Sequence, residues 1–292
     1  MRIGAFEVSD DLPALREPHA IAMLRPWIDA GSVGALALAE VERQYGSERI
    51  ASLARPDAFY DYTRYRPTVY LKDGQRSLSV PNTVVTVARP PSGPDLVLVK
   101  MLEPHMFAGR FIESVLRLLA NLGVRRYYWL GSMYDMVPHT RPLLVSGGAI
   151  GKDAERDVRA WGILPTDYQG PSTLTFQIVQ RAPMMGIESM WSIVHLPQYV
   201  QVDEDYVGKL RLMELLRSLY GLEIDEADSE RAREQLDTIE EAMADNPDLA
   251  ASVPHFESRY QAKLDRREAD TPPLPFDVER FLEQLGDDDG SD

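Results

Sequence analysis

The sequence predicts an α/β protein with a mixed, largely parallel central sheet flanked by helices and a C-terminal all-helical extension. Apolar runs typical of buried strands alternate with segments of helical periodicity between about residues 20 and 200. From Asp203 onward the spacing is helical only. That second part carries roughly 26 acidic and about 10 basic residues, which leaves residues 1–202 close to neutral.

These observations divide the chain into three parts. Residues 1–202 are expected to form the α/β core, and residues 203–285 an acidic helical region that could serve as a lid. Residues 286–292 are expected to be a disordered tail. The helices expected in the acidic region are Val207–Tyr220, Ile224 to about Ala244, Leu249–Arg267 and Phe276–Leu285.

The first strand and helix are expected at Ala20–Arg25 and from Val33 onward. Asp29 or Ser32 could cap this helix. With Gly31 they form a turn at a helix N-terminus, which is a corner that can accept an anion. Close packing of small residues explains the same pattern more simply.

The segment Gly46–Tyr65 reads as a loop with an aromatic cluster, Phe59, Tyr60, Tyr62 and Tyr65. The cluster could stack on a base or sugar, but more often such a cluster packs a loop onto the body. A hairpin insertion follows at residues 68–80, where Asp73-Gly74 is typical of a primed turn. Its free edge is a natural pairing surface. The next strand is expected at Thr83–Ala88.

A βαβ unit occupies the centre of the chain. Leu96–Val99 and Val124–Leu130 are the expected strands, and Phe107–Leu122 is the helix, ended by Gly123. Later elements are a strand at Leu143–Ile150, helices at Asp153–Trp161 and Thr173–Ala182, with Ser172 as the N-cap of the second, and a strand at Ile187–Val194.

In open α/β sheets, ligands collect beyond the carboxyl ends of parallel strands. Polar side chains in the loops expected there are the candidates for ligand binding. They are Asp29, Gly31, Ser32, Glu103, His105, Ser132, Tyr134, His139, Arg141, Tyr168 and Ser172.

Several kinds of chemistry are disfavoured. The absence of cysteine excludes disulfides, zinc thiolates and thiol catalysis. The five histidines form no H-E-x-x-H pair, so neither a metal nor a cofactor is expected. Ser132, Asp135 and His139 lie together in sequence but lack a G-x-S-x-G elbow. Glu103 and His105 could act as acid and base, or be hydrogen-bonded loop residues, so whether the protein is an enzyme stays open.

Composition also bears on partners and location. The net charge of −15 argues against nucleic-acid binding, which needs a basic face. No run approaches the roughly 20 apolar residues of a membrane span, so no membrane association is expected. The N-terminal residues contain no apolar signal core, which predicts a cytoplasmic protein.

Ordered blocks of the sequence resemble a known family. They are DAGSVG after the first strand, GPDLVLV, NLGV, YWLGSM with MVPHTRP, and YQGPSTLTFQIVQRAPMMGIESMWSIVHLPQYV, followed by KLRLMELLRSLYGLEID. Over about residues 1–225 the chain resembles the bacterial branch of the proteasome assembly chaperone 2 family. The resemblance implies a core like that of purine nucleoside phosphorylases, homo-oligomers with trimers favoured, and C-terminal helices over a pocket. It supplies no agreed catalytic residues.

Two hypotheses about function follow. The first is an oligomeric binding or assembly protein that engages a protein partner and has a ligand pocket at the carboxyl edge of the sheet. The alternative is a small-molecule enzyme or ligand binder of phosphorylase-like fold that acts on a nucleoside or an amino-carboxylate.

Overall fold

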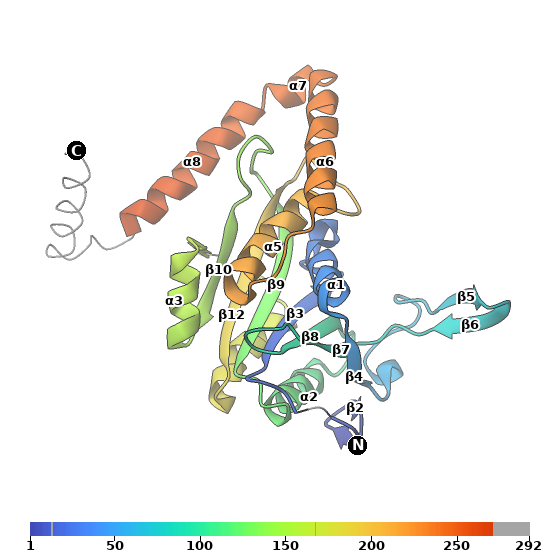
Figure 1. The fold of residues 1–292 in the computed structure, drawn as a ribbon. Coiled ribbons are helices and arrows are strands. Elements are labelled where there is room, and N and C mark those ends of the chain that lie inside the picture. Colours follow the sequence, from blue (N-terminus) through green and yellow to red (C-terminus); the bar gives the residue numbers. More distant parts are fainter. Residues whose placement is uncertain (13, 167, 271–292) are drawn as a thin grey trace, which may run out of the picture.

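A ten-stranded mixed sheet forms the centre of the computed structural model, which describes residues 1–12, 14–166 and 168–270 (Figure 1). Four neighbouring strands in its middle run parallel. In spatial order they are β8 (Leu96–Leu102), β3 (His19–Arg25), β9 (Arg126–Asp135) and β12 (Glu188–Pro197). The predicted α/β class and the central βαβ unit are therefore confirmed.

The remaining strands extend this parallel group on both sides. Beyond β8 the pairing is antiparallel throughout, in the order β7 (Val84–Ala88), β4 (Glu48–Leu53), β2 (Phe6–Val8) and β1 (Arg2–Ile3). Beyond β12 lies antiparallel β10 (Val145–Ile150), to which the short β11 (Leu164–Pro165) pairs in parallel.

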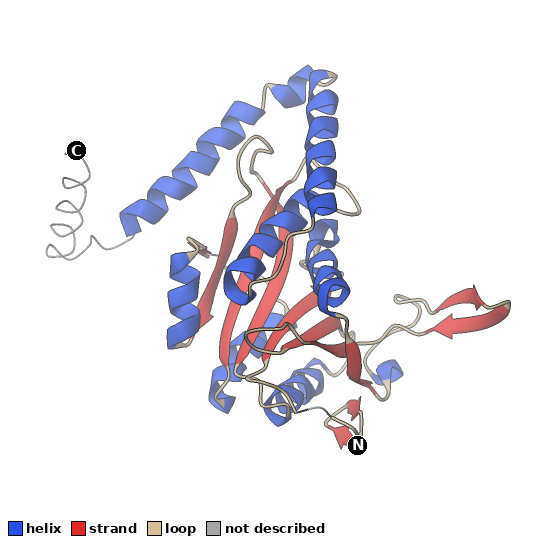
Figure 2. Ribbon diagram, viewed as in Figure 1, coloured by secondary structure: helices blue, strands red, loops and turns tan. Residues whose placement is uncertain are grey.

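Helices cover both faces of the sheet, as Figure 2 shows. One face packs against α2 (Ala108–Asn121) and α4 (Leu174–Arg181), and the other against α1 (Val33–Tyr45) and α5 (Tyr206–Tyr220). Each face of the sheet has its own hydrophobic core, and alternate residues of β3 contribute to one core or the other. A strand buried on both faces reads as a continuous apolar run rather than an alternating one.

Smaller helices complete the body. The helix α3 (Lys152–Ala160) packs against β10 and β12, and three 3₁₀ turns lie at Ala30–Ser32 (η1), Pro56–Ala58 (η2) and Ala182–Met185 (η3). After α5 the chain forms α6 (Glu226–Ala244), α7 (Pro247–Ala250) and α8 (Val253–Asp270). In Figure 1, α6 rises beyond the sheet and α8 descends again toward the β10 edge.

The predicted hairpin insertion is confirmed. Strands β5 (Thr68–Lys72) and β6 (Gln75–Ser79) form a separate two-stranded sheet that projects away from the body (Figure 1). The division into domains at residue 202 stays a prediction. The helix expected at 276–285 and the tail 286–292 fall outside the described residues. None of the described helices has both the length and the apolar character needed to cross a bilayer.

Three details differ from the sequence-based expectations. The segment Gly46–Tyr65 contains the strand β4, which the sequence does not predict because its first two residues, Glu48 and Arg49, are charged and only the last four are buried. Strand β9 runs to Asp135 rather than Leu130, so Ser132 and Tyr134 lie in the strand and not in a loop. Helix α4 takes Thr173 as its N-cap, without a side-chain bond, so Ser172 is not the cap.

Candidate functional site

The carboxyl ends of β3 and β8 form a topological switch point. These strands are parallel neighbours, but β3 leads to α1 on one face of the sheet and β8 leads to α2 on the other. Such points are where α/β sheets open to ligands. The loops that leave the two strands, residues 26–32 and 103–107, start side by side, because Glu103 N–H donates to the carbonyl of Arg25 at 2.9 Å.

Asp29 is the most unusual group of the first loop. Its Oδ1 accepts a hydrogen bond from the backbone N–H of Gly34 at 2.7 Å, so Asp29 and not the Ser32 side chain caps α1. Its Oδ2 is buried and has no partner among the described residues. Burial raises the pKa of Asp29 from 3.8 to about 6. Ser132 lies across a parallel bridge from Asp29 and donates to the carbonyl of Ala30 at 2.7 Å.

The start of α5 closes over this loop. Asp205, which caps α5 by accepting from the N–H of Gly208, donates its own N–H to the carbonyl of Gly31 at 2.8 Å. Gly31 has a φ of +57°, and a Cβ there would lie 2.6 Å from the Cβ of Asp205. Tyr134 is half-buried beside the same segment, and burial raises its pKa. The candidates Asp29, Gly31, Ser132 and Tyr134 are thus gathered, but their polar groups largely bind the chain itself.

Glu103 and His105 serve a different purpose at this edge, because they hold the root of the hairpin. The Tyr65 hydroxyl donates to the carbonyl of Glu103 at 3.1 Å, and the Tyr65 ring lies 4.5 Å from the imidazole of His105. His105 Nδ1 accepts from the N–H of Asp61 at 3.2 Å. The aromatic loop residues therefore pack the loop onto the body, as favoured from the sequence.

His139 and Arg141 lie under α8. The Tyr199 hydroxyl accepts from the N–H of His139 and lies 2.8 Å from His139 Nδ1. Tyr199 stacks on Phe256 of α8 with ring centroids 5.4 Å apart. Arg141 Nε lies 3.3 Å from a carboxylate oxygen of Glu257, also on α8. His139, through Tyr199, and Arg141 therefore help to hold α8 against the body of the protein.

Tyr168 and Ser172 do not share the carboxyl edge. Their loop leaves β11, which is parallel to β10, and β10 runs against β12. The carboxyl end of β11 therefore faces the opposite edge of the sheet. Both residues are exposed, and the Tyr168 hydroxyl donates to the carbonyl of Pro171 at 3.0 Å within its own loop. The expectation that one rim collects all the candidate residues is wrong for these two.

A polar array that sequence reasoning missed links three strands. His195 Nδ1 lies 2.7 Å from Asp135 Oδ2, and His195 Nε2 lies 2.7 Å from the Ser146 hydroxyl. Lys263 of α8 reaches the same Asp135 oxygen at 2.5 Å. Hydrogen bonds from His195 and Lys263 hold the pKa of Asp135 well below its usual range. No motif joins these residues, since only the pairing of β9, β12 and β10 brings them together.

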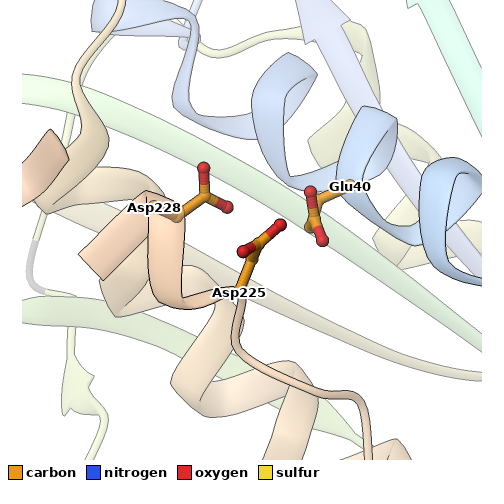
Figure 3. A group of neighbouring side chains, drawn as sticks. All are labelled: Glu40, Asp225 and Asp228. Atoms are coloured by element: carbon orange, nitrogen blue, oxygen red, sulfur yellow. The ribbon is translucent and has the colours of Figure 1, made fainter. Parts of the chain in front are cut away.

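Three carboxylates, Glu40, Asp225 and Asp228, meet where α1, α5 and α6 pack together (Figure 3). Their oxygens already bind cations of the chain. Arg43 lies 2.6 Å from both Glu40 and Asp225, and Lys209 contacts Glu40 and Asp228. This group is therefore an ion-pair network that fastens α6 to the body.

A cavity lies at the other edge of the sheet. A cavity of about 440 Å³ opens at the amino ends of β3 and β9, lined in part by His19, Arg126, Trp161 and Tyr220. Burial lowers the pKa of His19 to about 4. This is the edge opposite to the one for which the sequence predicts a pocket.

The carboxyl edge presents apolar side chains to solvent. Trp27 follows β3, and Met106 and Phe107 follow β8; their exposed fractions are 58%, 43% and 63%. We call these three residues the edge patch. Exposed apolar groups gathered on adjacent loops are typical of surfaces that bind other proteins.

Comparison with solved structures finds the same fold in bacterial proteins. A PAC2 family protein from Streptomyces avermitilis is 29% identical, with a TM-score of 0.72 over 82% of this chain and 99% of that one. A Mycobacterium tuberculosis protein of unknown function is 27% identical, with a TM-score of 0.77 over 92% of each chain. A proteasome-assembly chaperone homologue from the same organism is 25% identical, with a TM-score of 0.71 over 81% and 98%.

The comparison with curated proteins finds no match. The model of the PAC2 family, however, matches residues 23–245, which include every strand of the parallel group except the first four residues of β3, together with α1 to α5 and α6. A match of this extent decides the family: the chain belongs to the PAC2 family.

Proposed function

We propose that this protein is a homo-oligomeric assembly protein of the cytoplasm, with a trimer favoured, and that it binds other proteins through the carboxyl edge of its sheet. One observation carries the proposal. The polar candidates at this edge are largely engaged within the chain, whereas the edge patch is open to solvent. An edge built in this way offers little to a polar metabolite and much to an apolar protein surface.

Proteasome subunits are the proposed class of partner, because one similar structure is described as a proteasome-assembly chaperone homologue. The test is biolayer interferometry with purified proteasome α and β subunits. The double variant Trp27→Ser/Phe107→Ser should weaken binding at least about tenfold, since two apolar anchors are lost. Met184→Ser is the matched control, because Met184 is 84% exposed but lies on η3, which precedes the amino end of β12. Absence of binding by the unaltered protein would refute the proposed partner class.

A second candidate function rests on the array of Ser146, His195 and Asp135. A serine hydroxyl hydrogen-bonded to a histidine that a half-buried carboxylate orients resembles the arrangement used for acyl transfer. In that reaction the Ser146 oxygen would attack an acyl carbonyl while its proton passes to His195 Nε2. The bond from the carbonyl carbon to the leaving group would then break, and the leaving group would take that proton from His195 Nε2. This candidate is the small-molecule enzyme that the sequence leaves open, with an acyl compound in place of a nucleoside.

A fluorophosphonate probe tests the second candidate directly. Covalent labelling of Ser146 that is lost in Ser146→Ala and retained in Ser132→Ala would establish it. Lys263→Met should increase the labelling, because it removes the ion pair that holds α8 against Asp135 and so opens the array to the probe. If neither the unaltered protein nor Lys263→Met is labelled, the array is structural only.

A further inference from the structure

The cavity at the amino edge of the sheet is built by separate parts of the chain. Its volume of about 440 Å³ is within the range usual for small-molecule sites. The first residues of β3 and β9 contribute His19 and Arg126 to the lining. Helix α3 and its C-cap contribute Asp157 and Trp161, and the end of α5 contributes Tyr220. The cavity is therefore enclosed by both strands and helices of the body.

The charged groups of this cavity are already paired with one another. The buried guanidinium of Arg126 lies 2.7 Å from Asp157 and 3.0 Å from Glu188. The exposed Arg156 lies 3.0 Å from Asp153 and 3.1 Å from Asp157. A ligand with a net charge would meet groups of its own sign and would compete with these ion pairs. The cavity therefore favours an uncharged ligand.

Hydrogen-bonding capacity remains after these pairs are made. A guanidinium has five N–H donors. The bonds of Arg126 to Asp157 and Glu188 use one donor on each terminal nitrogen, and its Nε is buried without a partner among the described residues. His19 Nδ1 lies 3.3 Å from the Tyr220 hydroxyl. Because burial lowers the pKa of His19 to about 4, the imidazole is neutral at pH 7 and offers a hydrogen bond rather than a charge.

Aromatic rings form part of the same lining. The rings of His19 and Tyr220 meet edge to face, with centroids 5.6 Å apart, and Trp161 is half-buried. The ring of a sugar or cyclic polyol has a face of C–H groups that packs on aromatic rings, and its hydroxyls both donate and accept hydrogen bonds. A wholly apolar ligand fits poorly, because it would remove water from the polar groups without replacing its hydrogen bonds.

We propose that this cavity binds a small uncharged polyhydroxyl compound, of the size of a monosaccharide or a cyclic polyol. The ring of the ligand packs on Trp161, and its hydroxyls accept from the remaining donors of Arg126 and donate to Asp153. The site lies at the edge of the sheet opposite to the edge patch and shares no residue with it. The proposal is therefore independent of the protein-binding role, and either can fail without the other.

Saturation-transfer NMR on the full chain tests the class of ligand. Glucose, galactose, ribose and myo-inositol are the uncharged probes, and glucose 6-phosphate and glucosamine are the anionic and cationic ones. At least one uncharged probe should bind with a Kd of about 1 mM or less, and both charged probes should bind at least about tenfold more weakly than it does. If no uncharged probe gives a signal at about 10 mM, or if a charged probe binds more tightly, the proposal is overturned.

Two neighbouring residues of α5 test the location of the site. Ser218 and Arg217 are both exposed, but only Ser218 lines the cavity. Ser218→Trp fills part of the cavity and should weaken binding of the tightest uncharged probe at least about tenfold, whereas Arg217→Trp should change it by less than about twofold. Unchanged binding by Ser218→Trp would place the ligand elsewhere and overturn the proposal.

The indole N–H signals give a readout that needs no disruptive variant. The signal of Trp161, assigned by its loss in Trp161→Phe, should shift when the uncharged probe is added. The signal of Trp191 is the matched control, because Trp191 is also half-buried but packs against Phe176 and does not line the cavity. A Trp161 signal that stays in place while the probe binds would rule out this cavity as the site.

Discussion

Replacing Asp29 by Asn should change how the stability of the protein depends on pH. The amide keeps the oxygen that accepts from Gly34, but it cannot ionise. In the native protein the pKa of Asp29 is about 6, above its ordinary 3.8, because the carboxyl is buried with one oxygen unpartnered. The native state therefore holds this proton more tightly than the unfolded chain does.

The sign of the effect follows from linkage. Below about pH 3.8 both states are protonated, and Asp29 makes no pH-dependent contribution. As the pH rises toward 6 the unfolded chain ionises first, so the free energy of unfolding falls. Roughly two pKa units correspond to about 3 kcal/mol in full, of which about 2 kcal/mol develops between about pH 4.5 and pH 8.

Urea denaturation at several pH values measures this contribution. The difference in unfolding free energy between Asp29→Asn and the unaltered protein should shift by about 2 kcal/mol in favour of the variant between about pH 4.5 and pH 8. The cost of the unpartnered amide does not depend on pH, so it cancels from the shift. The exposed Asp11→Asn is the control. A difference that stays constant across the range would refute the reasoning about Asp29.

Three further changes test how the edge and the C-terminal helices are held. Gly31→Ala should destabilise the protein by more than about 2 kcal/mol, and more than Gly93→Ala, which has a similar positive φ but open space around it, as thermal unfolding can measure. Lys209→Met leaves the buried carboxylate of Asp228 with only the exposed Arg231, at 3.8 Å, as a cation and should cost about 3 kcal/mol in urea denaturation; an effect below about 1 kcal/mol would contradict the network. Phe256→Ala should raise hydrogen exchange in residues 253–266 while exchange in the central strands stays unchanged, because the helix α8 rests on the Tyr199 stack.

The centre of the fold could be predicted because its signals are local. The run AIAMLR in β3 is apolar on both faces, and the spacing of Phe111, Ile112, Val115, Leu118 and Leu119 defines the buried side of α2. The outer strands have weaker sequence signals. Strand β4 begins with the exposed Glu48 and Arg49, and only its last four residues are buried, so its sequence lacks the alternating pattern that predicts a strand.

The candidate site could be predicted in part, since the order of strands in space is not written in the sequence. Asp29 and Ser132 lie together, as expected, because the strands that precede and contain them, β3 and β9, are parallel neighbours. The sequence does not predict the His195 array, because its partners Asp135 and Ser146 are 60 and 49 residues away and meet it only through the pairing of three strands. The loop of Tyr168 lies at the opposite edge of the sheet because β11 is parallel to β10, and β10 is antiparallel to the central strands.

Topology alone does not determine the chemistry of the carboxyl edge. The rule for α/β sheets says where a crevice can form, and in this chain the start of α5 fills that place by bonding Asp205 to Gly31. Polar groups near this edge instead form hydrogen bonds that hold the C-terminal helices and the root of the hairpin. What reaches solvent is the apolar edge patch. The protein-binding role proposed for this edge therefore rests on which segments dock there and not on the fold alone, because the chemistry of an edge depends on the segments that cover it.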